Sequence, residues 1–206
     1  GCAFTSVAVF MGYSFMRREK AGEMRALGEQ ARVALRESLE AMKQRDYAAA
    51  EAAGNRAVRL AQRVHTEGTT RDVELLATAY LFRGESRAGL PTTEKLKQAV
   101  ADYTKCVELN PSDEDRFLAH YGRGQVRFRL GQTQEAEADF TQALKINAYS
   151  AHVYGARAQT RRRLGNVEGA NADERRVQEL GGSMQPEEPA GPSDPAPPAA
   201  AGQAQA

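Results

Sequence analysis

The sequence predicts an all-α fold of about four stacked pairs of antiparallel helices, and two observations carry this prediction. Residues 117–150 read as two helices separated at Gly131, because apolar residues recur every three or four positions on each side of that glycine. The layout returns 34 residues later, where Leu130-Gly131 is matched by Leu164-Gly165. One pair cannot bury its own apolar face, so a repeat of this period indicates an array of mutually covering pairs.

The first 16 residues form an uncharged, largely apolar segment that ends at Arg17 and Arg18. As a helix it would span about 24 Å, less than the roughly 30 Å hydrocarbon core of a bilayer. Four interpretations stay open: the end of a bacterial lipoprotein signal with Cys2 acylated, the last part of a transmembrane helix, a myristoylation site at Gly1, or a soluble helix packed on the repeats.

From this segment we expect a membrane anchor over residues 1–16 and a location in the bacterial cell envelope, with a cytoplasmic location as the alternative. Arginine greatly outnumbers lysine and alanine is abundant. That bias is typical of a GC-rich bacterial genome. Of the four interpretations, the lipoprotein interpretation, in which Cys2 carries the lipid, is favoured.

The helical-repeat domain is expected over residues 17–182. Residues 17–45 predict one long helix, and its second half opens a degenerate first repeat. In this repeat Gly54 stands where an aromatic residue is expected, and Gln44-Arg45 replaces Leu-Gly. Residues 65–70 predict a loop before the second repeat.

The second repeat, residues 73–113, has an enlarged turn at residues 89–93. Pro91 cannot lie inside a helix, and Thr92 or Thr93 can cap the helix that follows. From residue 183 onward the sequence holds most of the prolines, only acidic charges and one large aliphatic residue, Met184. Such a composition cannot bury enough apolar area to order the chain, so residues 183–206 predict a disordered tail.

The repeat resembles the tetratricopeptide repeat (TPR) family over roughly residues 31–182. The residues that carry the resemblance are the Leu-Gly turn, the small residues Ala136, Ala143 and Ala170, the aromatic Phe140, and the Asn110-Pro111 ending. The resemblance implies a right-handed superhelical solenoid that binds other proteins, with the first helix of each pair lining a concave groove.

Mapped residue by residue, the family pattern gives the partner-binding groove an apolar and aromatic middle and a basic end at residues 161–163. Such a groove suits an extended peptide or an amphipathic helix with an acidic end. The lysine and asparagine clamp of the chaperone-binding subgroup is absent, so chaperone-tail binding is not predicted. The groove residues are Leu81, Phe82, Glu85, Leu118, Tyr121, Gln125, Phe128, Arg129, His152, Gln159, Arg162 and Arg163.

Nothing in the sequence points to catalysis. Cys106 matches a small-residue position and is expected to pack as a small hydrophobe. The three histidines, His65, His120 and His152, lack the spacing of a zinc site, and no phosphate-binding glycine motif is present. We therefore expect no metal, no cofactor and no small-molecule substrate.

The favoured function is a non-catalytic protein-interaction scaffold, tethered to a membrane, that helps to assemble an envelope complex. Two alternatives are an RNA-binding helical-repeat protein and an accessory or regulatory subunit of an enzyme. The net charge of +1 and the lack of a continuous basic stripe argue against nucleic acid.

One recurring pair of charged residues predicts a structural feature. Arginine recurs at one repeat position and aspartate at another: Arg83, Arg123 and Arg157 with Asp102, Asp139 and Asp173. We expect each arginine to bond the aspartate on the second helix of its own repeat, which would fix the geometry of the pair.

Overall fold

The computed structural model describes residues 2–67 and 72–181, with the side chain of Met16 and those from Arg18 onward, apart from Asp72. This part of the chain contains eight helices and no strand, so the predicted all-α class is confirmed. The helices are α1 (Cys2–Lys43), α2 (Tyr47–Glu67), α3 (Asp72–Ala88), α4 (Thr93–Glu108), α5 (Asp113–Arg129), α6 (Thr133–Ile146), α7 (Ala151–Arg163) and α8 (Val167–Glu179).

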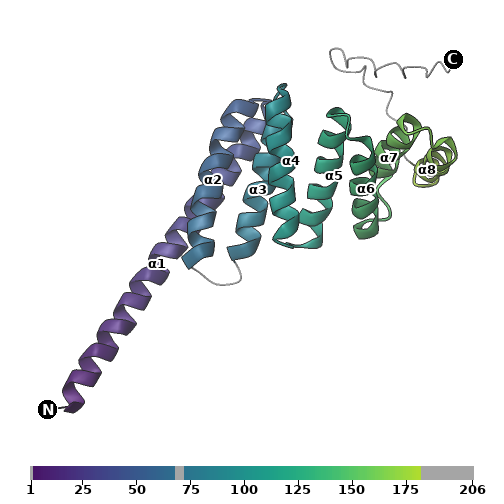
Figure 1. The fold of residues 1–206 in the computed structure, drawn as a ribbon. Helices are drawn as coiled ribbons and strands as arrows, with labels where there is room; N and C mark the ends of the chain where they lie inside the picture. The colour runs from purple at the N-terminus through teal and green to yellow at the C-terminus, as the bar shows by residue number, and fades with distance from the viewer. Residues whose placement is uncertain (1, 68–71, 182–206) are drawn as a thin grey trace, which may run out of the picture.

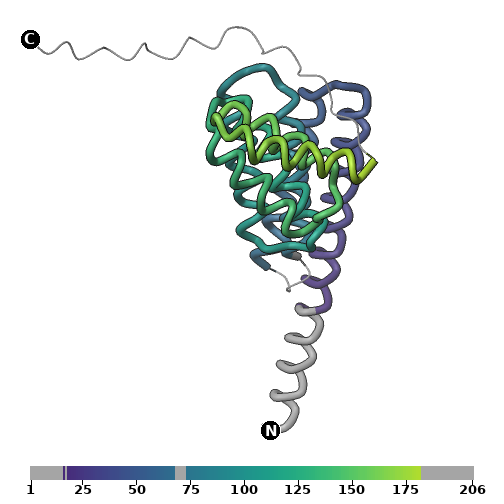
Figure 2. Tube along the Cα trace, turned by 90° about the vertical axis from the view of Figure 1, so that its right-hand side faces the viewer, coloured from purple at the N-terminus to yellow at the C-terminus, as the bar shows by residue number. Residues whose placement is uncertain are grey.

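The helices form four antiparallel pairs that follow one another along the array (Figure 1), and in Figure 2 the pairs lie one behind another. We call α1, α3, α5 and α7 the front helices and α2, α4, α6 and α8 the back helices. Each front helix contacts the next front helix, whereas no two back helices of the described chain contact each other. The array therefore curves with the front helices on its inner side.

Helix α1 is continuous over 42 residues, about 63 Å of helix, and its first part projects beyond the array in Figure 1. No break in the helix marks the predicted boundary between residues 16 and 17. None of the described helices has an apolar stretch long enough to cross a membrane. The side chain of Cys2 and the predicted tail, residues 183–206, lie outside what the structure describes.

The first helix pair extends further than the sequence predicts at the end opposite the turn that joins α1 to α2. Residues 65–67 belong to α2, so the predicted loop is wrong there, and residues 68–71 are outside the described chain. The extension is stabilised across the pair, because Met24 and Leu27 of α1 pack with Val64 of α2. An ion pair of 3.4 Å between Lys20 Nζ and Glu67 Oε2 lies at the very end.

The turns inside the pairs follow the predicted chemistry. Gly131 and Gly165 have positive φ of 75° and 79°, a conformation that glycine adopts without a Cβ clash. In the degenerate first repeat Arg45 takes the same place with φ of 61°. In the enlarged turn the backbone N–H of Lys95 donates to Thr92 Oγ1 at 3.3 Å, which confirms the predicted cap.

Small side chains let the helices approach closely. Ala136, Ala143 and Ala170 are fully buried, and the aromatic Phe140 beside them is 1% exposed. The missing aromatic at Gly54 also has a steric reason. A Cβ built at Gly54 would lie 3.1 Å from Cβ and 3.2 Å from Cα of Arg83, so α2 and α3 pack almost backbone to backbone there.

Candidate partner-binding groove

The predicted groove residues lie on the front helices α3, α5 and α7, but they differ in exposure. Leu81 is only 1% exposed and packs in the core between the second and third pairs, so it offers no contact surface; its prediction as a groove residue is wrong. The exposed members are Gln125, Arg129, His152, Arg162 and Arg163, and the partly buried ones are Phe82, Glu85, Leu118, Tyr121, Phe128 and Gln159.

Aromatic residues occupy the middle of this inner face, on α5. The rings of Phe117 and Tyr121 stack with centroids 6.4 Å apart, and Tyr121 meets the buried ring of Phe140 at 6.1 Å. The Nε2 of Gln125 donates to the Tyr121 hydroxyl at 3.0 Å. The face therefore presents aromatic surface whose position is fixed from below by the core.

Buried ion pairs hold each front helix to its own back helix. Arg83 donates to Asp102 at 2.6 and 2.9 Å, and the matching bonds of Arg157 to Asp173 are 2.7 and 2.9 Å. Arg123 donates to Asp139 in the same way, with a shortest distance of 2.7 Å. The predicted arginine–aspartate pairing is confirmed in all three repeats.

The same arginines also reach the preceding pair of helices. Their third nitrogen, Nη1, donates to a polar side chain on the preceding back helix, at 3.0 to 3.3 Å. The acceptors are Asn55 for Arg83, Thr104 for Arg123 and Thr141 for Arg157. Each arginine thus links the two helices of its own pair to the back helix of the preceding pair, which fixes the stacking angle as well as the pair.

A second arginine one helical turn later was missed by the sequence reasoning, although its recurrence is visible in the sequence. Arg87, Arg127 and Arg161 each donate to the same aspartate as their predecessor, at 2.7, 2.6 and 2.9 Å. Each aspartate is therefore held between two guanidinium groups. Burial alone would raise the pKa of Asp139, but hydrogen bonds from His120 and Arg123 lower it below its usual value.

The Nε of this second arginine distinguishes the three junctions between pairs. Arg87 Nε donates to Glu51 on the preceding back helix at 2.9 Å, and Arg161 Nε donates to Glu137 at 2.6 Å. The matching residue on α4 is Val100, and Arg127 Nε is buried without a hydrogen-bond partner in the described chain.

The predicted basic end of the groove is largely engaged within the chain. Arg161 binds Glu137 and Asp173, and Arg162 Nε donates to Glu174 on α8 at 2.8 Å. Arg163 lies 4.0 Å from the ring centroid of Phe128. A long arginine side chain near a helix end finds such intramolecular partners readily, so the expectation of a free cationic patch for an acidic partner is not supported by this geometry.

The surface between α3 and α5 is acidic, in contrast to the basic end of the groove. Glu85 is partly buried, and burial together with the charge of Asp115 raises the pKa of its carboxyl to about 7. Burial and the charges of Asp115, Glu74 and Glu85 raise the pKa of the Cys106 thiol to about 12. Cys106 is fully buried, as predicted, and a thiol with this pKa carries almost no nucleophilic thiolate at neutral pH.

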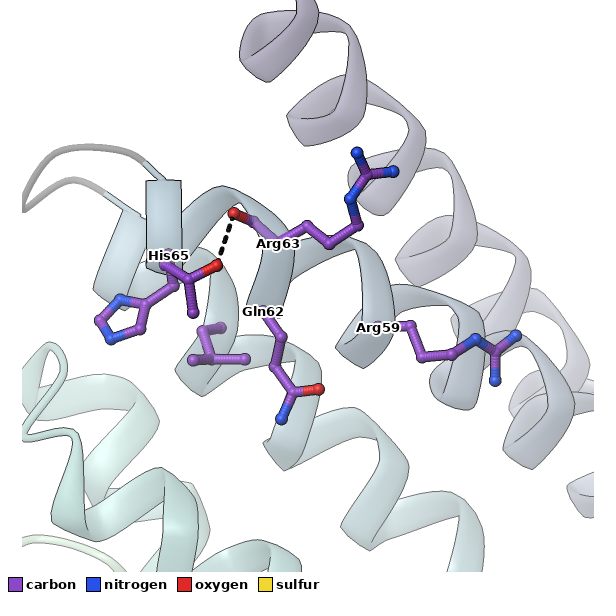
Figure 3. Close-up of a pocket in the computed structure, with 6 residues that line it drawn as sticks. Arg59, Gln62, Arg63 and His65 are labelled. Carbon is purple, nitrogen blue, oxygen red and sulfur yellow. Dashed lines mark hydrogen bonds between the residues drawn. The ribbon is translucent and has the colours of Figure 1, made fainter.

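A shallow hollow of about 560 Å³ lies between α2 and α3, away from the groove. Its α2 side chains Arg59, Gln62, Arg63 and His65 point in different directions in Figure 3, and so they do not converge on a ligand. Within the described residues no cluster of histidine, cysteine and carboxylate side chains has the arrangement of a metal site.

A curved array of helix pairs whose front helices line the inner face is the architecture of a helical-repeat interaction scaffold. The chain contains tetratricopeptide repeats: family models described as tetratricopeptide repeat match residues 117–149 and 92–113. Hsc70-interacting proteins 1 and 2 of Drosophila melanogaster are each 36% identical over 87 residues, 42% of this chain. The match spans only 22% of those relatives.

Two solved structures of MamA also resemble the fold. The crystal structure of MamA protein is 14% identical, with a TM-score of 0.46, and the match covers 74% of this chain and 92% of that chain. MamA MSR-1 is 20% identical, also with a TM-score of 0.46, and the match covers 74% and 97%.

Proposed function

We propose that this TPR protein is a membrane-tethered scaffold that holds a peptide or amphipathic helix of a partner protein against the inner face of α3, α5 and α7. The observation that carries the proposal is a run of partly buried large side chains across neighbouring front helices: Phe82, Leu118, Tyr121 and Phe128. Aromatic anchors that are held in place by a core and still open to solvent are the side chains that dominate binding energy at interfaces.

The arginine–aspartate links support this proposal because they make the inner face rigid. Each of the three links joins a front helix to its back helix and to the preceding pair. A partner that enters a pre-formed surface avoids the entropy of ordering it, which favours affinity. Because these arginines are engaged, the inner face of the described helices carries no continuous basic stripe, so RNA binding is not proposed.

The test is photo-crosslinking from Gln125, an exposed position on α5, followed by mass spectrometry of the captured partners. Phe128→Ala should abolish capture of the specific partner, whereas Tyr149→Ala should not, because Tyr149 is 77% exposed in the loop between α6 and α7. A charge at another exposed groove position, His152→Glu on α7, serves as a second groove variant that leaves the core untouched. Capture unchanged in both groove variants would overturn the proposal.

The membrane part of the proposal places the lipid on Cys2 and the protein in the bacterial cell envelope. The long continuous α1 supports it, because a rigid helix would hold the groove at a set distance from the bilayer. Mass spectrometry of the mature protein should show a diacyl or triacyl adduct on Cys2, and Cys2→Ser should move the protein from the membrane to the soluble fraction. An unmodified N-terminus in a membrane-bound protein would refute the lipid anchor.

A further inference from the structure

Three carboxylates face the junction between α3 and α5 without a cationic partner among the described residues. They are Glu74 and Glu85 on α3 and Asp115 on α5. The neutral donors they meet are the Thr78 hydroxyl, 2.7 Å from Asp115 Oδ2, and the backbone N–H of Ser112, 3.3 Å from Glu74 Oε2. Four arginines of these helices are engaged elsewhere: Arg83 and Arg87 bind Asp102, Arg123 binds Asp139, and Arg129 donates to the Ala88 carbonyl at 2.6 Å.

A second, independent feature lies at the same junction. Tyr103 of α4 is 2% exposed, and its hydroxyl makes no hydrogen bond to the described residues; the oxygen is not among their fully buried polar atoms without a partner, so solvent reaches it. Its ring lies against two glycines of the front helices. A Cβ would lie 3.1 Å from the ring at Gly84, and at Gly122 it would lie 2.8 Å from the hydroxyl oxygen. The hydroxyl therefore points to the inner face, beneath a position on α5 that has no side chain to cover it.

In the free protein an unpaired, partly buried carboxylate is disfavoured as an anion, and the Tyr103 hydroxyl oxygen has no donor bound to it among the described residues. One ligand group relieves both, because an ammonium or guanidinium group carries the positive charge that Glu85 lacks and the N–H donors that a phenol oxygen accepts.

We propose that the junction of α3 and α5 is a subsite for a lysine or arginine side chain of the bound partner, which ion-pairs with Glu85 and donates a hydrogen bond to the Tyr103 hydroxyl. The inference rests on the proposed groove function and names the chemistry of its partner. It reverses the expectation of an acidic partner. The arginines expected to bind such a partner are engaged within the chain, whereas Glu74, Glu85 and Asp115 have no cationic partner among the described residues.

The subsite should bind more tightly as the pH rises through neutrality. Glu85 faces Asp115 of α5 and Tyr103 and Cys106 of α4, and burial with the charge of Asp115 raises its pKa to about 7. Glu74 of α3 adds negative charge nearby, and Arg129 of α5 is held at 2.6 Å by the Ala88 carbonyl. A group with this pKa is about 10% ionised at pH 6 and about 90% at pH 8, so cation affinity should rise roughly tenfold.

The experiment is a selection of peptides from a random 12-residue phage library on the full chain at pH 8. Wild type is run in parallel with Glu85→Gln and with Glu135→Gln, an exposed glutamate on α6 that serves as the matched control. We expect lysine or arginine to be enriched at one peptide position with wild type and Glu135→Gln, and not with Glu85→Gln. Synthetic peptides then give dissociation constants by fluorescence polarisation.

With a selected peptide, Glu85→Gln and replacement of the peptide cation by glutamine should each weaken binding at least tenfold, and the double change should be no worse than either. Tyr103→Phe should weaken binding about threefold without lowering Tm, because the free protein loses no hydrogen bond. A purely structural role of Tyr103 would instead lower Tm and leave the affinity unchanged.

Two results would overturn the inference, and they differ in what else they imply. Peptides that bind wild type and are lost with Phe128→Ala, but show no cation dependent on Glu85, would remove the cation subsite and leave the groove function intact. Peptides that bind equally to wild type and Phe128→Ala would remove both.

Discussion

The orphaned Nε of Arg127 gives the most direct test of how the repeats are joined. At the equivalent places Arg87 Nε and Arg161 Nε donate to Glu51 and Glu137 at 2.9 and 2.6 Å. The residue at this position on α4 is Val100, so Val100→Glu should supply the missing acceptor. A buried donor without a partner costs about 1–3 kcal/mol.

The gain is partly offset, because Val100 is partly buried against the core between the second and third pairs and loses about 1 kcal/mol of apolar burial. We therefore expect a net stabilisation of about 1 kcal/mol, which corresponds to a rise in Tm of about 2–4 °C for a domain of this size. Thermal and urea unfolding followed by circular dichroism would measure it, with urea midpoints compared at equal slope.

Two controls separate the new bond from general effects. Ala101→Glu adds the same charge at the exposed neighbouring position and should change Tm by less than about 1 °C, and Val100→Gln tests how far a neutral acceptor suffices. The stabilisation should vanish when Arg127→Met is combined with Val100→Glu. If Val100→Glu is no more stable than Ala101→Glu, the reasoning from the equivalent junctions is refuted.

Three further predictions concern single positions. Arg45→Gly should stabilise the protein by about 0.5–1 kcal/mol because φ of 61° strains a residue with a Cβ, whereas Lys43→Gly in the last turn of α1 should destabilise it by a similar amount in the same unfolding assay. Ala136→Leu should overpack a fully buried position and cost about 1–3 kcal/mol, while the exposed Ala138→Leu on the same helix should be near neutral; equal Tm values for the two would contradict a tight contact. Glu85→Gln should stabilise the protein at pH 8 by up to about 3 kcal/mol, and the difference should disappear near pH 4.5, because burial raises the folded-state pKa to about 7 and stability falls as pH rises through that value; a difference independent of pH would count against it.

The back helices and the turns could be predicted from the sequence because their constraints are steric and local. Only a small residue fits at Ala136 and Ala170, and only a residue tolerant of positive φ fits at Gly131 and Gly165. Such positions recur at the period of the repeat, so one sequence reveals them. The end of α2 was placed too early, since the packing of Val64 on α1 overrides the polar local sequence.

The groove was harder to predict because its chemistry depends on which charges meet inside the fold. Leu81 occupies a family groove position, yet its side chain is buried in the core. The sequence predicts Arg163 to be a free cation, but its guanidinium lies over the Phe128 ring. The sequence alone does not show which of several nearby groups a long side chain will contact. The lone charge of Glu85 is visible only once the arginines around it are seen to be bound to aspartates.

The junction between the second and third pairs combines two departures from the repeat. It is the one of the three described junctions at which the second arginine lacks a glutamate on the preceding back helix, and it is also where the unpaired carboxylates of α3 and α5 meet. In a stacked array each pair contacts only its neighbours, so a ligand at this junction acts on a single interface. Other bonds still cross that interface, since the Thr78 hydroxyl lies 2.7 Å from Asp115 Oδ2 and Arg129 Nη1 donates to the Ala88 carbonyl at 2.6 Å. Because Val100→Glu adds a link without altering Glu85, a selected cationic peptide should bind this variant with unchanged affinity; a large change in affinity would show that the two features of the junction are coupled.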